Sequence, residues 1–201
     1  MTVAMTVECG MQKQVVWSLM LVCGLVSAAS AEVLTGKEAK KVLFPATGVS
    51  VQVIKQAFLA EGQAQILGSV ATEQPYYGAI AVSPDEGLMS EATIAAANYH
   101  NEAAATAAAL AGCDAARKGA AACVIVALVR PKGWEAQPIQ LSAEATTAFR
   151  KEYAGKGGAL AVSAATGTWG MAKGDNAADA AVAACAAKLT GTNDCSVVVA
   201  N

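Results

Sequence analysis

Four cysteines in the second half of the chain form two pairs with the same internal spacing. Each pair spans ten positions, and the second pair lies 72 positions after the first: Cys113 with Cys123, and Cys185 with Cys195. Upstream, Gly78–Ser83 recurs as Gly158–Ser163, and a valine-rich run follows the second cysteine of each pair. Three matching blocks in the same order are hard to obtain by chance, so the sequence contains an internal repeat.

Each copy has the pattern of a β-hairpin followed by a helix and a strand. Turn residues at Pro84–Gly87 predict a hairpin with its second strand near 88–95, and residues 164–167 are expected to form the same turn. The alanine-rich segments 101–112 and 176–188 favour helices. The valine-rich runs are closing strands. The expected fold is α+β, with two repeated β-hairpin–helix–strand units forming antiparallel sheet packed by helices.

The cysteines are placed where disulfides would tie each helix to its sheet. In each copy one cysteine is near the end of the helix and the other begins the last strand. Four cysteines allow three connectivities, and we expect pairing within each copy, Cys113 with Cys123 and Cys185 with Cys195. Closing a loop of about ten residues contributes roughly 2–3 kcal/mol, which is large for a core rich in alanine and valine. The spacing does not fit a C-x-x-C redox centre.

The first 31 residues have the order of a secretory signal peptide. Lys13 precedes an apolar run of 12 residues, Val15–Val26, and a small-x-small motif ends at Ala31. The run is too short to span about 30 Å of hydrocarbon as a helix. We expect export to the periplasm or the exterior, with no stable membrane span after cleavage. Met11 is a more natural start than Met1, with the first ten residues (1–10) as a candidate over-extended start, and the choice between the two is left open.

The remaining segments divide the chain further. We expect a signal peptide (1–31), an N-terminal extension (32–75) and a duplicated α+β domain (76–201), the last made of repeat one (76–129), a connector (130–156) and repeat two (157–201). Without a low-complexity linker, these parts are predicted to form one compact domain.

The segments outside the repeats also carry secondary-structure signals. Thr35–Glu38 has the spacing of a capping box, which opens a short helix that must end before Pro45. Alternating valines at 49–53 predict a strand, whereas 55–67 fits a helix or a strand and is left open. Residues 142–153 are expected to form a helix that ends at the following glycine.

Composition argues against several classes of function. Only 5% of residues are aromatic although 55% are hydrophobic, so the core is thin and close-packed. A formal net charge of −2 gives no electrostatic reason to bind nucleic acid or an anionic bilayer. His100 is the only histidine, which excludes multi-histidine metal sites. We expect no metal and no cofactor.

The loop between the repeats carries the strongest binding signal. Trp134 lies close in sequence to Arg130 and Lys132, and an aromatic ring beside two cations can hold a carbonyl, a carboxylate or a sugar ring. The alternative is that Trp134 folds over the alanine-rich core. Tyr76 and Tyr77 are expected to alternate, with one ring inside and one outside, and Tyr77 is a further candidate binding residue.

His100 is the one candidate for acid or base chemistry. It lies just before a predicted helix, where a capping or surface role is the simpler interpretation. A general base would also need a nucleophile or substrate within hydrogen-bond reach. Ser83 and Ser163 end strands without the G-x-S-x-G motif of a nucleophile elbow, so we interpret them as turn residues and assign no catalytic residue.

The duplicated Gly-Ala-(Ile/Leu)-Ala-Val-Ser strand, the alanine-rich helix ending in cysteine and the Cys-then-Val strand resemble the exported bacterial family DUF4189, over about residues 76–129 and 157–201. The resemblance implies a secreted or periplasmic α+β domain and supplies no catalytic residues. Small proteobacterial proteins of this type are sometimes labelled aminolevulinate synthase. A mature chain of about 170 residues is too short for the large pyridoxal-phosphate fold of such an enzyme.

Three functional hypotheses follow from the sequence. The first is a non-enzymatic exported module that binds a protein or an envelope component through a surface formed by the two halves and the Trp134 loop. The second is a small periplasmic hydrolase-like enzyme that uses His100. The third is a structural or stress-related envelope protein.

Overall fold

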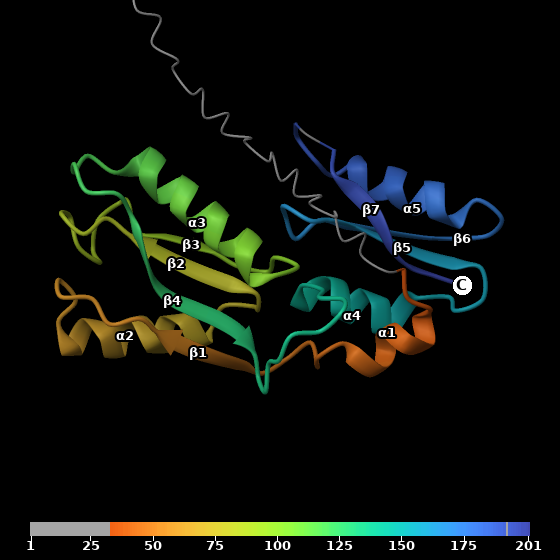
Figure 1. Ribbon diagram of the computed structural model, residues 1–201, viewed down its shortest axis with the longest axis horizontal. Helices are drawn as coiled ribbons and strands as arrows, with labels where there is room; N and C mark the ends of the chain where they lie inside the picture. Colours follow the sequence, from red (N-terminus) through yellow and green to blue (C-terminus); the bar gives the residue numbers. More distant parts are fainter. Residues whose placement is uncertain (1–32, 192) are drawn as a thin grey trace, which may run out of the picture. The chain divides into compact units, whose positions relative to one another are not determined.

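The computed structural model describes residues 33–201 with the exception of residue 192 (Figure 1). In chain order its elements are α1 (Gly36–Val42), β1 (Val49–Val53), α2 (Glu61–Thr72), β2 (Gly78–Val82), β3 (Ile94–Ala96), α3 (Glu102–Ala116), β4 (Val124–Pro131), α4 (Ala143–Glu152), β5 (Gly158–Ser163), β6 (Trp169–Lys173), α5 (Ala177–Ala186) and β7 (Cys195–Ala200). The predicted signal peptide and its cleavage site lie outside the described residues.

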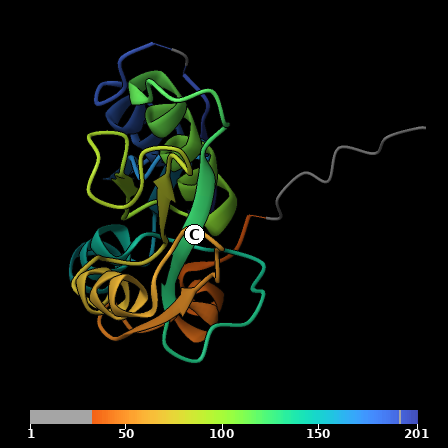
Figure 2. The same ribbon diagram turned by 90° about the vertical axis from the view of Figure 1, so that its left-hand side faces the viewer.

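The first sheet is antiparallel, has the strand order β1-β4-β2-β3 and is covered on both faces (Figure 1, Figure 2). Its central strand β2 alternates small and large residues. Ala79 and Ala81 pack against α3, whereas Ile80 and Val82 pack against α2. Because alanine leaves little side chain between helix and strand, α3 can lie close to the sheet.

The second sheet repeats this arrangement with the strand order β6-β5-β7. Ala159 and Ala161 of β5 face α5, and Leu160 and Val162 belong to the cluster that includes residues of α1 and α4. Each sheet is therefore covered by an alanine-rich helix on one face and by larger apolar residues on the other.

Copy one (β2, β3, α3, β4) and copy two (β5, β6, α5, β7) match in detail. The central and closing strands shift register at equivalent points, between Ile80 and Ala81 and between Leu160 and Ala161. Each helix buries a stripe at every fourth position: Ala105, Ala109 and Cys113 on α3, and Ala177, Ala181 and Cys185 on α5. The α+β prediction of two repeated hairpin–helix–strand units is confirmed.

The structural repeat begins upstream of the matching sequence blocks. Thr72 ends α2 and Glu152 ends α4, and each lies the same number of positions before the central strand, which begins at Gly78 or Gly158. The helix of the connector thus takes the place in copy two that α2 has in copy one. The stretch left open at 55–67 contains the start of α2 at Glu61.

The N-terminal extension contacts both copies through similar backbone hydrogen bonds. The amide of Leu34 donates to the carbonyl of Val198 at 3.0 Å, and the amide of Ile54 donates to the carbonyl of Val126 at 2.8 Å. Val126 and Val198 are equivalent bulge positions in β4 and β7. Between these contacts, the predicted capping box at Thr35 opens α1, and β1 forms as predicted.

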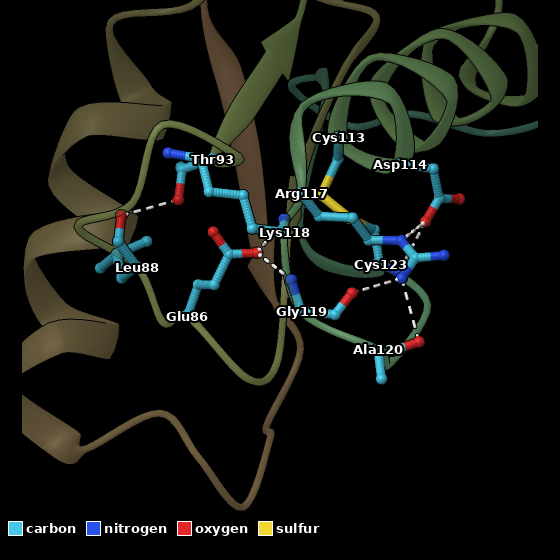
Figure 3. The surroundings of a disulfide bond; sticks show 10 residues. All are labelled: Glu86, Leu88, Thr93, Cys113, Asp114, Arg117, Lys118, Gly119, Ala120 and Cys123. Carbon is cyan, nitrogen blue, oxygen red and sulfur yellow. Dashed lines mark hydrogen bonds and ion pairs between the residues drawn. A yellow bond between two sulfur atoms is a disulfide. The ribbon is translucent and has the colours of Figure 1, made fainter.

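Both disulfides form within a copy, as predicted. Cys113 of α3 is bonded to Cys123 just before β4, and Cys185 of α5 is bonded to Cys195 at the start of β7. The Cα atoms are 6.0 and 6.1 Å apart, so the two bonds span nearly the same distance between helix and sheet. The surroundings of the first bond are shown in Figure 3.

The predicted tight hairpin of copy one is wrong. Its second strand is only Ile94–Ala96, and a long loop precedes it. The carboxylates of Asp85 and Glu86 accept hydrogen bonds from backbone amides of the loop after α3. The expected turn residues therefore contact that loop and do not connect directly to β3. In copy two the amide of Ser163 donates to the carbonyl of Thr168 at 3.0 Å, and the predicted short hairpin forms.

Within the described part of the chain, no helix combines the length and apolar character needed to cross a membrane.

Candidate functional site

Four side chains, from two strands, one helix and one turn, meet beside the edge of the first sheet. We call them the Arg130 platform: Gln52, Glu102, Arg130 and Trp134. Arg130 is near the end of β4, and Gln52 lies on the neighbouring strand β1, whose exposed positions alternate. Glu102 is in the first turn of α3. Trp134 follows β4 in a turn closed by a hydrogen bond that its backbone amide donates to the carbonyl of Pro131 at 3.1 Å.

The Arg130 guanidinium is held in one orientation by three partners. Its Nε donates to Oε2 of Glu102, and its Nη1 donates to Oε1 of Gln52 at 3.0 Å. Its Cζ lies 4.7 Å from the centre of the Trp134 ring, within the range of a cation–π contact. The bond to Glu102 raises the pKa of Arg130. With 26% of the Arg130 side chain exposed, the platform is a rigid surface that combines a cation and an aromatic ring.

Both tyrosines before β2 are buried, so the prediction of one inward and one outward ring is wrong. Tyr76 and Tyr77 are each 1% exposed, with ring centroids 5.4 Å apart in an edge-on arrangement. The alternation rule does not apply to them because β2 begins only at Gly78. Burial raises the pKa of the Tyr77 phenol, and the neighbouring Trp134 side chain lowers it by less. Tyr77 therefore lies buried beside Trp134 and does not offer a free surface.

Lys132 does not join the platform. It lies in the turn after β4, where its amide donates to the carbonyl of Gly48 at 3.1 Å, and it is exposed. The structure thus brings Arg130 and Trp134 together as the sequence suggested and leaves Lys132 apart. The pairing partners Glu102 and Gln52 were not predicted. Alternation in the 49–53 strand could have placed Gln52 on the polar face, but nothing local identifies β4 as its neighbour.

His100 lies elsewhere and is buried, with 2% of its surface exposed, and Asn101 caps α3, so the predicted capping or surface role of His100 is wrong. Its Nδ1 accepts the amide of Ser142 at 3.0 Å, so Nε2 carries the proton and donates to the carbonyl of Thr168 at 2.9 Å. Burial lowers the pKa of the ring, which favours this neutral form. Because both ring nitrogens are hydrogen-bonded to backbone groups, the ring has no lone pair available for proton abstraction. It connects the segment before α3 to Ser142 and Thr168.

Asn98 provides a second connection between the same segments. The side-chain nitrogen of Asn98 donates to the Glu144 carboxylate at 3.0 Å, and its side-chain oxygen accepts a hydrogen bond from the Glu144 backbone amide at 3.1 Å. The residue has a φ of 65°, in the left-handed region that asparagine tolerates better than most residues. A Cβ at Gly167 would collide with the Asn98 carbonyl, so these two backbones are in direct contact.

Carboxylates surround the first disulfide and hold the loop that it closes (Figure 3). Glu86 accepts the amides of Lys118 and Gly119 at 2.9 and 3.0 Å, and these bonds lower its pKa. Asp114 accepts the amide of Cys123 at 3.0 Å and the Nε of Arg117 at 2.7 Å. The carboxylate oxygens of Glu86 and Asp114 are thus bonded to groups of the chain itself, so these residues stabilise the loop and do not form a binding site. In the described residues, no group of three or more His, Cys, Asp or Glu side chains could hold a metal ion.

Comparisons with known proteins give no relative: the chain matches no family model, no curated protein and no solved structure.

Proposed function

We propose that this protein is an exported, DUF4189-like module that acts by binding a protein or an envelope component, without catalysis of its own. The observation that carries the binding role is the Arg130 platform, in which a partly exposed guanidinium is fixed over an indole ring. Tryptophan, tyrosine and arginine dominate the energetics of protein interfaces. A side chain already held in place loses less entropy on binding, which favours the platform as a contact surface.

Support for export comes from the two disulfides and from the leader-like composition. Disulfides form and persist mainly in oxidising compartments such as the periplasm and the exterior. Both bonds close a copy whose buried helix stripe consists of alanine and cysteine, so each helps a core with few large side chains. The apolar run Val15–Val26 is consistent with a secretory signal. The DUF4189 assignment rests on the duplicated cysteine spacing and the small-residue strands.

The geometry of His100 argues against the hydrolase alternative. A general base needs a free lone pair directed at a substrate. The Nδ1 lone pair is used by the Ser142 amide, and Nε2 is bonded to Thr168.

Partner capture tests the proposed function. The exported protein would be immobilised in oxidising buffer and exposed to an extract of the cell envelope, with Arg130→Met and Trp134→Ala as test variants. Lys132→Met is the matched control, because it removes a neighbouring exposed cation that does not touch the platform. We expect a bound component that the control retains and both test variants lose. Equal retention by all folded variants would contradict the proposed binding surface.

A further inference from the structure

A groove separate from the Arg130 platform lies where copy one meets copy two. Its volume is about 380 Å³, at the lower end of the range for small-molecule sites. Six of its lining residues carry the argument: Asn98, Tyr99, Glu144, Thr168, Trp169 and Lys188. They come from the segment before α3, the first turn of α4, the second hairpin and the segment after α5.

The groove is lined where the two copies differ. The register makes Trp169 equivalent to Thr93, and the cysteine spacing makes Lys188 equivalent to Ala116. Asn98 and Tyr99 belong to a connection between strand and helix that is longer in copy one. The shared fold forms without an aromatic ring or an ammonium group at these places. The shared fold therefore does not require these side chains, although Trp169 and Tyr99 each also pack against a core cluster.

The charged groups of the groove are already compensated. The Lys188 ammonium lies 4.1 Å from the centre of the Trp169 ring and donates to the Trp169 carbonyl at 2.8 Å. The Glu144 carboxylate accepts the side-chain amide of Asn98 at 3.0 Å. One cation and one anion, each with a partner, do not favour a ligand with net charge. They still have hydrogen-bonding capacity, since an ammonium has three donors and a carboxylate about four acceptor sites.

The shape of the groove is fixed in advance. The Asn98 carbonyl and Gly167 are in direct contact, and His100 joins the Ser142 amide to the Thr168 carbonyl beside the groove. A site whose polar groups do not need to be rearranged loses less entropy when a ligand binds.

We propose that this groove binds a neutral saccharide, a proposal that rests on the proposed function and names an envelope component of suitable chemistry. Sugar hydroxyls donate and accept hydrogen bonds, which suits the mixture of amide, carboxylate, hydroxyl and ammonium groups in the lining. The C–H faces of a sugar ring pack against aromatic side chains, which Tyr99 provides; the Trp169 ring is already covered by the Lys188 ammonium. The predominance of polar residues disfavours an aliphatic chain.

Isothermal titration calorimetry on the exported protein tests this assignment with cellotriose, maltotriose and chitotriose as neutral probes. The dipeptide alanyl-alanine serves as a zwitterionic probe. We expect at least one trisaccharide to bind with a Kd of about 1 mM or tighter. Glu144→Gln and Lys188→Met should each weaken binding about tenfold, because each removes a charge-assisted hydrogen bond. The matched controls Glu152→Gln and Lys173→Met, at the other end of α4 and on β6, should leave the Kd unchanged.

Three results would overturn the saccharide assignment: no binding of any trisaccharide to folded protein, equal binding by test and control variants, or binding of the dipeptide alone. The envelope capture experiment separates this failure from failure of the proposed function. Groove variants that still capture a partner through Arg130 would leave the binding role intact. If the unaltered protein captured no partner but still bound a trisaccharide in calorimetry, the Arg130 binding role would be removed and the groove assignment would remain.

Discussion

Copy one and copy two bring an alanine-rich helix close to a sheet, but they make room for it on opposite surfaces. In copy one the glycine is on the helix: a Cβ at Gly112 would lie 3.1 Å from Cγ2 of Ile94 on β3. In copy two it is on the strand: a Cβ at Gly170 of β6 would meet the backbone of Ala181, Ala184 and Cys185 on α5.

The helix and strand positions that meet in copy one are equivalent to those that meet in copy two. Ile94 pairs with Ala81 as Gly170 pairs with Ala161, so Ile94 corresponds to Gly170. The cysteine offset makes Gly112 correspond to Ala184. The duplication has therefore kept the separation between helix and sheet and not the residues that provide it. A missing side chain on either surface serves the same purpose.

A hydrogen bond between a carboxylate and a backbone amide joins the hairpin to the loop after the helix in both copies, but donor and acceptor change places. In copy one Glu86 of the hairpin loop accepts amides from Lys118 and Gly119. In copy two Asp194, in the loop after α5, accepts the amide of Ala165 in the hairpin at 2.8 Å. Both copies join the same two loops with a carboxylate, but the acceptor comes from opposite sides.

The largest expected effect distinguishes the two glycines. Gly170→Ala should destabilise the protein by about 4 kcal/mol or prevent folding, because backbone atoms of α5 cannot move away from the new methyl group. Gly112→Ala should change stability by only about 1 kcal/mol in either direction, since better helix propensity offsets crowding of the Ile94 side chain. Urea unfolding of both variants measures the difference. Equal changes in stability for the two variants would contradict the interpretation that the space is provided by the helix in copy one and by the strand in copy two.

The next effect concerns the two disulfides. Replacing either pair by alanine should lower stability by about 2–3 kcal/mol, as expected for loops of this length. Copy two should lose more, because in copy one the bonds from Asp114 to the Cys123 amide and to Arg117 still hold the loop, whereas the cysteine offset places Ala186 at that position in copy two. Chemical unfolding of the two double variants ranks them. A larger loss from Cys113 and Cys123 would show that those carboxylate bonds do not support the loop.

A smaller effect comes from His100, which copy two lacks. Its folded pKa is lowered by burial from an ordinary value of 6.5, so the unfolded chain binds the proton first as the pH falls. Stability should therefore decrease below about pH 6.5, with a slope of up to about 1.4 kcal/mol per pH unit, until the folded pKa is reached. His100→Gln should remove that slope. An unchanged slope between pH 7 and 5 would mean that another group titrates there.

The smallest effect is expected at Glu86. Its pKa is lowered by the amides of Gly119 and Lys118, so its contribution is present above its unfolded pKa and is lost as the pH falls through the folded value. The protection factors of these two amides, taken relative to intrinsic exchange at each pH, should decrease in acid and, in Glu86→Gln, should depend less on pH. The Ala165 amide, bonded to Asp194 in copy two, serves as the internal control. Identical protection factors in the variant and the original protein would contradict this role of Glu86.

Much of the fold follows from local patterns in the sequence. The repeated Gly-Ala-Ile/Leu-Ala-Val strands predict the central strands, because alternation of small and large residues places alanine toward the helix. The capping box at Thr35 marks the start of α1. By contrast, α2 contains Gly62 and Gly68 and has few large apolar residues, so its helical character depends on packing by Leu67 and Ala71.

The candidate sites were less predictable because their contacts are distant in sequence. His100 bonds to groups 42 and 68 positions away, and Glu86 bonds to amides 32 and 33 positions away. Arg130 and Trp134 are near neighbours and could be identified together, but Gln52 reaches Arg130 across 78 positions. Such partners are set by the topology of the sheets, which local spacing does not determine.

A tryptic digest of the non-reduced protein, read by mass spectrometry, tests the central claim that each copy is closed by its own disulfide. Cleavage sites separate all four cysteines, which lie in peptides 56–117, 119–132, 174–188 and 189–201. We predict two linked species, 56–117 with 119–132 and 174–188 with 189–201. A bond from either of the first two peptides to either of the last two, or free thiols in all four, would contradict the account.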